Sequence, residues 1–320
     1  MSTITTLDSI ERNLYQFGGP FLIAFGSIGS VLNVMVFTKS SLRKNPCALC
    51  LTGINIVNFL SLYLVLLPAV LVRGYRIDFS WKDLLICRFQ FYIALVLACT
   101  QSSYIVLASI DRTLITSIDA HIRRISTQRL MMLNMFIIAL FWLVCHIHAL
   151  IHTQVLHIAP HSYVCFRSPG IYTKIMNYYS LLINGILPPL LMALFGLWTL
   201  KNVRAIRSMS NTARARHRTA YAVGRRYILH SKDHQLVRML LLDIISFAIC
   251  KCPSALVLMY EQCTQHIEKT PERQAIELSI LLITYFLYYI ENGISFYTNI
   301  FISKTFRREI RDTLRIHLLL

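Results

Sequence analysis

Long stretches of apolar residues dominate the chain, and short segments between them carry most of its charge. Seven stretches are long enough to cross the roughly 30 Å hydrocarbon core of a bilayer as helices of about 20 residues. They cover residues 17–38, 47–72, 84–110, 130–152, 175–200, 236–260 and 275–301. No internal repeat, low-complexity tract or Gly/Ser linker separates them. The pattern predicts one all-α integral-membrane domain, a seven-transmembrane helix bundle.

The third stretch predicts the centre of that bundle. It contains no charge from Phe89 to Ile110 and ends in Asp111-Arg112. Four consecutive polar residues, 100–103, stand in its middle and include Gln101. Polar side chains in hydrocarbon need partners on neighbouring helices, so we expect this helix to be surrounded by others.

The charge predicts an orientation. The chain has 32 Lys and Arg against 15 Asp and Glu, a formal net charge of +17, which could suggest nucleic acid as a partner. However, 22 of the 32 basic residues fall in the segments that share one side of the membrane with the C-terminus. Positive charge gathers on the cytoplasmic side, so we expect an external N-terminus, a cytoplasmic C-terminus, anionic membrane lipids as partners and no nucleic acid.

The predicted divisions are an extracellular N-terminus over 1–16, the seven-helix domain over 17–301, and an amphipathic helix with a short cytoplasmic tail over 302–320. The last segment places Phe306 and Ile310 on one helical face among arginines, which is typical of a helix on a membrane surface.

Three of the nine cysteines fall on the predicted outer side, namely Cys87, Cys165 and Cys263. An oxidising exterior permits a disulfide there, and a Cys87–Cys165 bridge would join the third helix to the loop before the fifth. The other six lie in apolar stretches, where a small buried thiol is the ordinary role.

Two ionisable residues, Asp243 and Lys251, lie within the sixth stretch. Each is either neutralised by another helix, with Arg112 and Glu291 as candidate partners, or takes part in function. We keep Lys251 as a possible contact for a ligand or a conformational switch. Histidines 146, 148 and 152 end the fourth stretch without an acidic or cysteine partner nearby, and we expect interfacial histidines and no metal site there.

The segment 201–238 contains ten basic residues and one acid, Asp233. It is either a solvated extension of two helices attracted to lipid or a docking surface for an acidic or amphipathic partner helix.

Landmarks in order along the seven spans make the chain resemble the rhodopsin-like (class A) G-protein-coupled receptors. Asn33 matches the asparagine of the first helix, and Asn58 stands where the second helix usually has an aspartate. Cys87 matches the third-helix cysteine bridged to the second outer loop, here to Cys165. The remaining landmarks are Asp111-Arg112-Thr113, Trp142, Pro188 or Pro189, Phe247-x-x-Cys250-x-x-Pro253 and Phe306-Arg307.

The resemblance implies a two-state receptor with no catalytic activity and no cofactor. Asp111 and Asp233 would hold Arg112 inward. An extracellular ligand would favour an outward swing of the sixth helix about Pro253, beside Phe247, and so expose Arg112 to a heterotrimeric G protein.

Two motifs depart from the family pattern. Lys251 replaces the usual tryptophan of the sixth helix, and the sequence from Ser295 to Asn299 replaces Asn-Pro-x-x-Tyr. Asn58, Gln101 and Ser295 also lack the carboxylate of the family's sodium site, so we do not expect modulation by sodium.

The chain looks most like invertebrate neuropeptide receptors, which implies a peptide ligand. The expected ligand pocket contains Arg88, Phe91, Lys251, Glu261, Tyr285 and Tyr289. The alternatives are a non-signalling seven-helix membrane scaffold and a transporter, although paired inverted repeats are not visible.

Overall fold

A computed structural model describes the backbone of residues 2–39, 45–77, 83–159, 162–167, 170–216, 231–264, 266–302 and 306–311. Side chains are described at 5–39, 45–77, 83–155, 165, 170–206, 238–264, 266–270, 272–301 and 306–311.

Seven helical spans in this part of the chain are long and apolar enough to cross a membrane, as the hydrophobic pattern predicts. The first contains α1 (Ser2–Asn13), the π-helical segment η1 (Leu14–Gly18) and α2 (Gly19–Phe37). The second contains α3 (Pro46–Ser61), η2 (Leu62–Leu66), α4 (Leu67–Ala69) and η3 (Val70–Gly74), and the third is α5 (Leu84–Ile115). The short α6 (Ala120–Ile125) precedes the fourth, which contains α7 (Gln128–Cys145) and α8 (Ile147–Ile151).

A hairpin of strands β1 (Thr153–Ala159) and β2 (Ser162–Arg167) leads to the fifth span. The sequence pattern did not predict these strands. That span contains α9 (Ile171–Tyr179), η4 (Ser180–Ile186) and α10 (Leu187–Arg216). The sixth is α11 (Ser231–Cys263) and the seventh is α12 (Pro271–Ile302). Helix therefore extends beyond several predicted boundaries, most of all at α1, before the first predicted stretch, and at the end of α10, after the fifth.

Three of the π-helical segments end two residues before a proline. Pro20 follows η1, Pro68 follows η2 and Pro188 follows η4. A proline cannot donate a backbone hydrogen bond, and its ring collides with the carbonyl four residues earlier. That carbonyl belongs to the π-helical segment each time, so the wider turns make room for the ring.

Side-chain caps stabilise the starts of α3, α5 and α7. The Oδ1 of Asn45 accepts from the Cys47 amide at the start of α3, at 3.0 Å. Asp83 does the same for Leu85 at the start of α5, at 2.8 Å, and Thr127 caps α7. Each satisfies an amide that has no partner within its helix.

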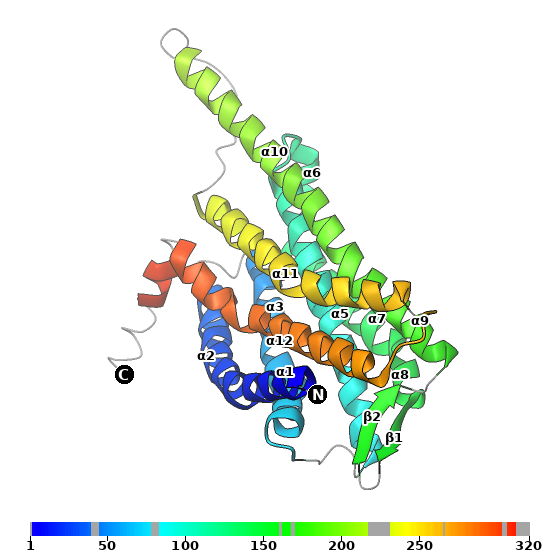
Figure 1. Ribbon diagram of the computed structural model, residues 1–320. Coiled ribbons are helices and arrows are strands. Elements are labelled where there is room, and N and C mark those ends of the chain that lie inside the picture. Colours follow the sequence, from blue (N-terminus) through cyan, green and yellow to red (C-terminus); the bar gives the residue numbers. More distant parts are fainter. Residues whose placement is uncertain are drawn as a thin grey trace.

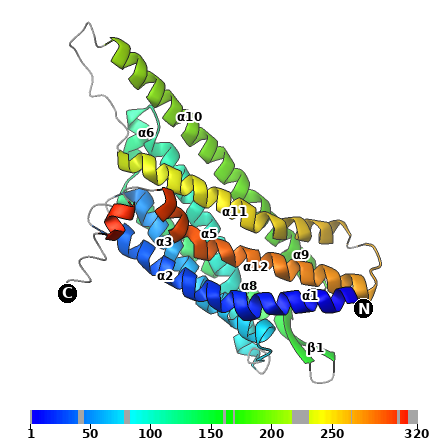
Figure 2. The same cartoon turned by 60° about the vertical axis from the view of Figure 1, so that its left-hand side comes forward.

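The helix α5 lies at the centre of the bundle, where it contacts α3, α7, α10 and α11 (Figure 1). Figure 2 shows α2, α12 and α11 next to one another, in agreement with their contacts. A large apolar core joins α2, α3, α5, α7, α10, α11 and α12. A second, smaller core lies between the first two spans and Phe286 of α12.

The helices α2 and α12 approach closely because glycine stands in both. A Cβ atom on Gly26 would lie 3.0 Å from the Cα of Gly293 and 2.7 Å from the Leu62 Cδ1. Small residues allow such backbone proximity between membrane helices.

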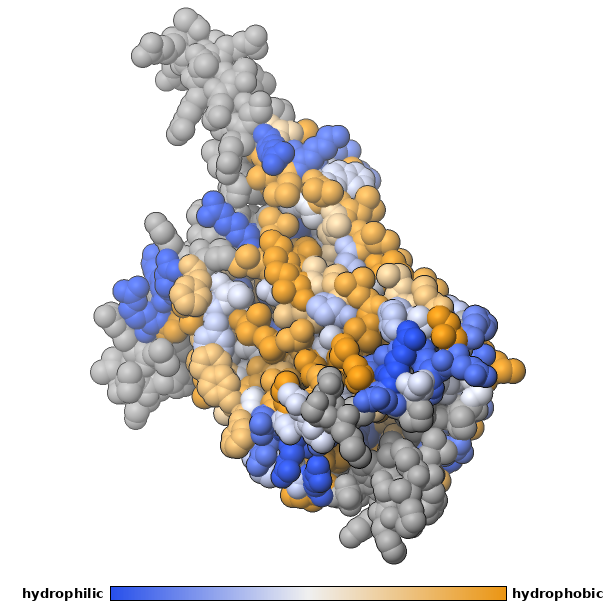
Figure 3. All heavy atoms as spheres, viewed as in Figure 1, coloured by the Kyte–Doolittle hydropathy of each residue, from blue (hydrophilic) through white to orange (hydrophobic). Residues whose placement is uncertain are grey.

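Large apolar side chains cover the outside of the bundle. Phe136, Leu197 and Phe301 are 66%, 67% and 81% exposed. Figure 3 shows hydrophobic residues over the middle of one face and hydrophilic ones mostly towards its edges. Exposed apolar surface of this extent is suited to lipid, so the chain is a multi-pass membrane protein.

A helical turn over 306–311 follows α12. Phe306 is buried against Phe37 and Phe296, with ring centroids 5.6 and 6.0 Å away, and Ile310 packs on the same core. The apolar face predicted for this segment therefore packs against the bundle.

We expect Gly26→Val to lower the stability of the protein by about 1–3 kcal/mol, because the new side chain forces α2 and α12 apart. Gly196→Val is the matched control, since a Cβ there meets only side-chain atoms, at 3.7 Å or more. Thermal unfolding of the purified protein in detergent measures both. Equal effects of the two variants would contradict the close packing at Gly26.

Candidate functional site: the disulfide and two polar networks

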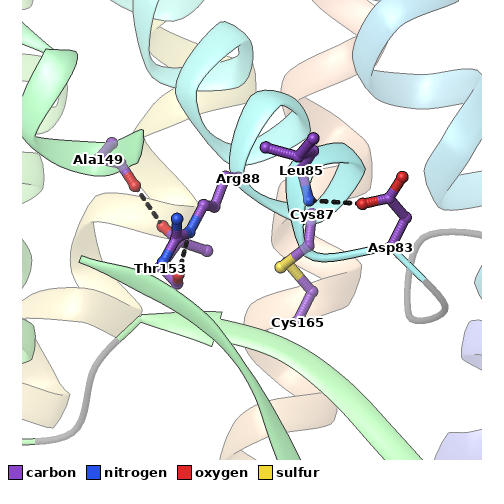
Figure 4. The surroundings of a disulfide bond; sticks show 7 residues. All are labelled: Asp83, Leu85, Cys87, Arg88, Ala149, Thr153 and Cys165. Carbon is purple, nitrogen blue, oxygen red and sulfur yellow. Dashed lines mark hydrogen bonds between the residues drawn. A yellow bond between two sulfur atoms is a disulfide. The ribbon is translucent and has the colours of Figure 1, made fainter. Parts of the chain in front are cut away.

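A disulfide fixes the β hairpin to the start of α5. Cys87 is fully buried and bonded to Cys165 of β2, with their Cα atoms 5.7 Å apart, so the predicted bridge is present (Figure 4). Beside it, Arg88 Nε donates to the carbonyl of Thr153 at 3.1 Å, and the Thr153 hydroxyl donates to the carbonyl of Ala149 at 2.7 Å. A covalent bond and a charged hydrogen bond thus hold the hairpin over this end of the bundle, which we call the disulfide end.

The opposite end of α5 holds a buried cation. The Arg112 side chain is 1% exposed, and its Nη2 lies 2.8 Å from Asp111 Oδ2. The same nitrogen donates to the Oδ1 of Asn45 at 2.8 Å. The other carboxylate oxygen of Asp111 accepts from the Ser126 hydroxyl at 2.5 Å. We call these four residues the arginine network and this end the arginine end.

Asp233, the other acid expected to hold Arg112, belongs to α11. The structure describes its backbone but not its side chain. The contact between Asp233 and Arg112 therefore stays a prediction.

A second network lies in the middle of the bundle, and we call it the lysine network. The Lys251 ammonium donates to Gln101 Oε1 at 2.6 Å and lies 3.5 Å from Glu291 Oε2. The Gln101 amide nitrogen is within 2.8 Å of oxygens on Asn58, Glu291 and Asn292. Lys251 is 3% exposed and Glu291 is 3% exposed, so bulk water stabilises neither charge.

Two aromatic rings complete the surroundings of the ammonium. The Lys251 Nζ lies 4.1 Å from the ring centroid of Phe247 and 3.9 Å from that of Tyr288. Ring faces attract a cation most when water is excluded. The lysine network therefore joins α3, α5, α11 and α12 in the middle of the bundle.

Glu291 corrects part of the sequence interpretation of this region. Asn58, Gln101 and Ser295 do lack a carboxylate, but Glu291 contributes one to the same group of side chains. The Lys251 ammonium already balances that charge. The sequence suggested Glu291 as a partner of Lys251 and Arg112 as a partner of Asp243. The first pair is present.

Arg112 is not the partner of Asp243. Asp243 is buried and accepts from the Ser295 hydroxyl at 3.3 Å. Its Oδ2 has no hydrogen-bond partner in the described part of the chain. Arg112 is bonded instead to Asp111, its neighbour in α5, and to Asn45 at the start of α3.

A further polar contact joins the first, second and seventh spans. Asn33 donates to Asn55 Oδ1 at 2.6 Å and accepts from the Asn299 amide at 3.4 Å. Asn33 and Asn299 are fully buried. These hydrogen bonds give the side-chain amides the partners that lipid tails cannot offer.

Pro253 stands inside α11, two residues beyond Lys251. The same helix therefore combines an interior proline with a buried ion pair to α12.

The residues expected to form a ligand pocket lie in different places. Lys251 is in the centre of the bundle, Arg88 supports the hairpin, and Tyr289 packs on the smaller core with Tyr15 and Phe286. Phe91, Glu261 and Tyr285 are half-buried. The described contacts do not bring the six together.

An open depression of about 410 Å³ lies between the ends of α11 and α12 at the disulfide end. Its lining includes Tyr260, Arg273 and Glu277. Glu277 Oε1 accepts from Arg273 at 3.0 Å, and Glu277 Oε2 accepts from Lys269 at 2.5 Å. The sequence interpretation missed this group, since residues 260 and 277 become neighbours only when α11 and α12 pair.

The histidines of the fourth span bond to tyrosines. His146 Nε2 lies 2.9 Å from the Tyr179 hydroxyl, and His148 Nδ1 lies 2.9 Å from that of Tyr172. No group of three His, Cys, Asp or Glu residues suited to a metal occurs among the residues whose side chains are described.

A family model described as "7 transmembrane receptor (rhodopsin family)" matches residues 29–295. The match covers most of the chain, from the first span to the seventh. The chain therefore belongs to the rhodopsin family of seven-transmembrane receptors. Members of this family are receptors and not enzymes, and membership implies an extracellular ligand and coupling to a G protein. No curated protein matches the sequence.

The ion pair of the lysine network gives a test of its energetics. We expect Lys251→Met to destabilise the protein by about 3–5 kcal/mol, because it leaves the Glu291 charge buried without its partner. The double variant Lys251→Met/Glu291→Gln should recover most of that loss. Thermal unfolding in detergent measures all three proteins.

Arg76→Ala is the control for this comparison. Arg76 pairs with Asp8 at the surface, with both side chains more than 60% exposed, and its removal should change the stability by less than about 1 kcal/mol. A double variant as unstable as Lys251→Met would show that the buried charge of Glu291 is not the cause.

Proposed function

We propose that this chain is a plasma-membrane receptor that binds an extracellular peptide and activates a heterotrimeric G protein. In this proposal the N-terminus and the disulfide end face outward, and the C-terminus and the arginine end face the cytoplasm. The excess of Lys and Arg in the segments at the arginine end supports this orientation.

The observation that carries the proposal is the burial of Arg112. A guanidinium with 1% exposure is costly at the end of a membrane bundle unless its partners offset the lost hydration. Asp111 is its described counter-ion, and Asn45 contributes a neutral oxygen. A shielded cation of this kind suits a switch that exposes the charge to a partner only in the active state.

The helix α11 is the element proposed to uncover Arg112. Met239, Leu240 and Phe247 of α11 pack in the same apolar core as Ile105 and Ala108 of α5. Displacement of this half of α11 about Pro253 would remove that cover and open a groove next to Arg112. A helix of the G protein would fill the groove.

The lysine network would couple the outer half of the receptor to this movement. Lys251 precedes the hinge and is bonded to α5 and α12 at once. A ligand that shifts α11 at the disulfide end must rearrange these buried bonds. Each rearrangement changes the relative energies of the two states, which is how ligand binding shifts their populations.

The depression between α11 and α12 supports a peptide ligand. Its lining is mostly apolar, with Ile276 and Ile280 beside the charged Arg273 and Glu277, and it is open to the outside. An open surface that combines apolar and charged side chains suits an extended peptide better than a small molecule that needs an enclosed cavity.

The first experiment concerns Arg112. At equal surface expression, we expect Arg112→Ala to abolish the response of second messengers to agonist, with the ligand found by screening a neuropeptide library. An unchanged response would contradict the proposal and favour a non-signalling membrane scaffold.

The second experiment concerns Asp233. An ion pair near the membrane face is worth about 1 kcal/mol, so Asp233→Ala should raise basal signalling by about fivefold. The substitution Glu309→Ala at the C-terminal turn, where Glu309 lies 3.3 Å from Lys39, serves as a control for loss of an acid at this end. Equal basal activity in wild type and Asp233→Ala would exclude the contact with Arg112.

A further inference from the structure

The short connection between α6 and α7 places a hydroxyl group directly on the arginine network. Ser126 directly follows the last residue of α6, and Thr127 directly precedes the first residue of α7. Both have extended backbones, with φ of −71° and −127°. The Ser126 hydroxyl donates to Asp111 Oδ1 while Asp111 Oδ2 holds Arg112. One carboxylate therefore separates this hydroxyl from the guanidinium.

The surroundings of Ser126 are basic and accessible. Arg123 and Arg124 precede it by three and two residues, and no acid occurs in α6. Arg124, Ile125 and Thr127 are exposed, and Ser126 itself is half-buried. Protein kinases select substrates partly by charge pattern, and an acidic binding groove recognises arginines ahead of the modified residue.

We propose that Ser126 is a phosphorylation site for a serine/threonine kinase that prefers basic substrates, and that the phosphate takes Arg112 from Asp111. This inference rests on the proposed function only in that the arginine end must face the cytoplasm, where ATP is available. The Ser126 oxygen attacks the γ-phosphorus of ATP and forms the new O–P bond. The bond to the β-phosphate oxygen breaks, ADP leaves, and the hydroxyl proton passes to the base of the kinase.

The modification reverses the interaction at Asp111. The unmodified hydroxyl donates a hydrogen bond to the carboxylate, whereas the phosphoester oxygen has no proton to donate. The phosphate adds about −1.5 to −2 charges and repels Asp111. It also offers strong acceptors to the guanidinium, and arginine binds phosphate in a two-pronged geometry. Arg112 would then be held towards the connection and withheld from a G-protein helix.

Other charged groups near the connection do not reproduce this effect. Asp119 caps α6 through the amide of His121, at 2.8 Å, and Arg123 donates to the carbonyls of Ser117 and Ile118, at 2.8 Å each. These groups hold the shape of α6, whereas Ser126 bonds to the counter-ion of Arg112.

The first test needs no signalling assay. The full-length protein in detergent is incubated with Mg-ATP and the catalytic subunit of cAMP-dependent protein kinase, and the modified residue is located by mass spectrometry. We expect phosphate on Ser126, no signal at this position in Ser126→Ala, and at least a tenfold slower reaction in Arg123→Gln/Arg124→Gln. Phosphate on Thr127 alone, or none in this connection, would overturn the site.

The second test links the site to Arg112. We expect Ser126→Glu to reduce agonist-stimulated signalling by about tenfold at equal surface expression. His121→Glu adds the same charge to exposed α6 away from Asp111, and should stay within about twofold of wild type. Equal effects of the two glutamates would overturn the link to Arg112.

The two proposals fail in different ways. A protein whose Arg112→Ala variant signals normally would refute the proposed function, while the mass spectrum still decides whether Ser126 is modified.

Discussion

The structure depends on one constraint: inside a bilayer, polar side chains must be satisfied by other parts of the same protein. Among the described side chains, the helices bury asparagines, serines, threonines, two glutamines, an arginine, a lysine and three acids. Through its side-chain amide, Gln101 connects α5 to three other helices, namely α3, α11 and α12. Because apolar contacts between helices gain little in lipid, where the tails are equally apolar, these bonds and close glycine contacts determine which helices meet.

The two polar networks have different characters. Lys251 and Glu291 form an ion pair between helices, enclosed by two aromatic rings, and its disruption exposes a charge to hydrocarbon. Asp111 and Arg112 are adjacent in one helix, and Asn45 and Ser126 connect them to the start of α3 and to the connection between α6 and α7. The lysine network therefore joins four helices at the centre of the bundle, whereas the arginine network lies at one end of α5.

The hydrophobic pattern predicted the seven spans because each is a long local signal. Three cysteines on one side of the membrane permitted a disulfide, and the family resemblance identified Cys87 and Cys165 as the pair. Local signals also placed Asn33, Gln101 and Lys251 in the interior. The sequence could not show which partners meet across helices. Asp243 was paired with Arg112 on charge alone, whereas packing places Ser295 beside it. Asn45 caps α3, and its second role as a partner of Arg112 depends on the meeting of α3 and α5.

The π-helical segments explain why a regular helical period fails in the second span. Beyond Ser61, the buried residues are Leu62, Leu66, Val70 and Gly74, each four positions after the last. An ideal helix of 3.6 residues per turn would rotate that stripe steadily away from the core, while wider turns hold it in place. Each wide turn stores about one additional residue relative to an α-helical path. Loss of a single residue from this stretch could therefore be absorbed by tightening one turn, with the helix ends and their neighbours left in phase, whereas an insertion would have no such reserve.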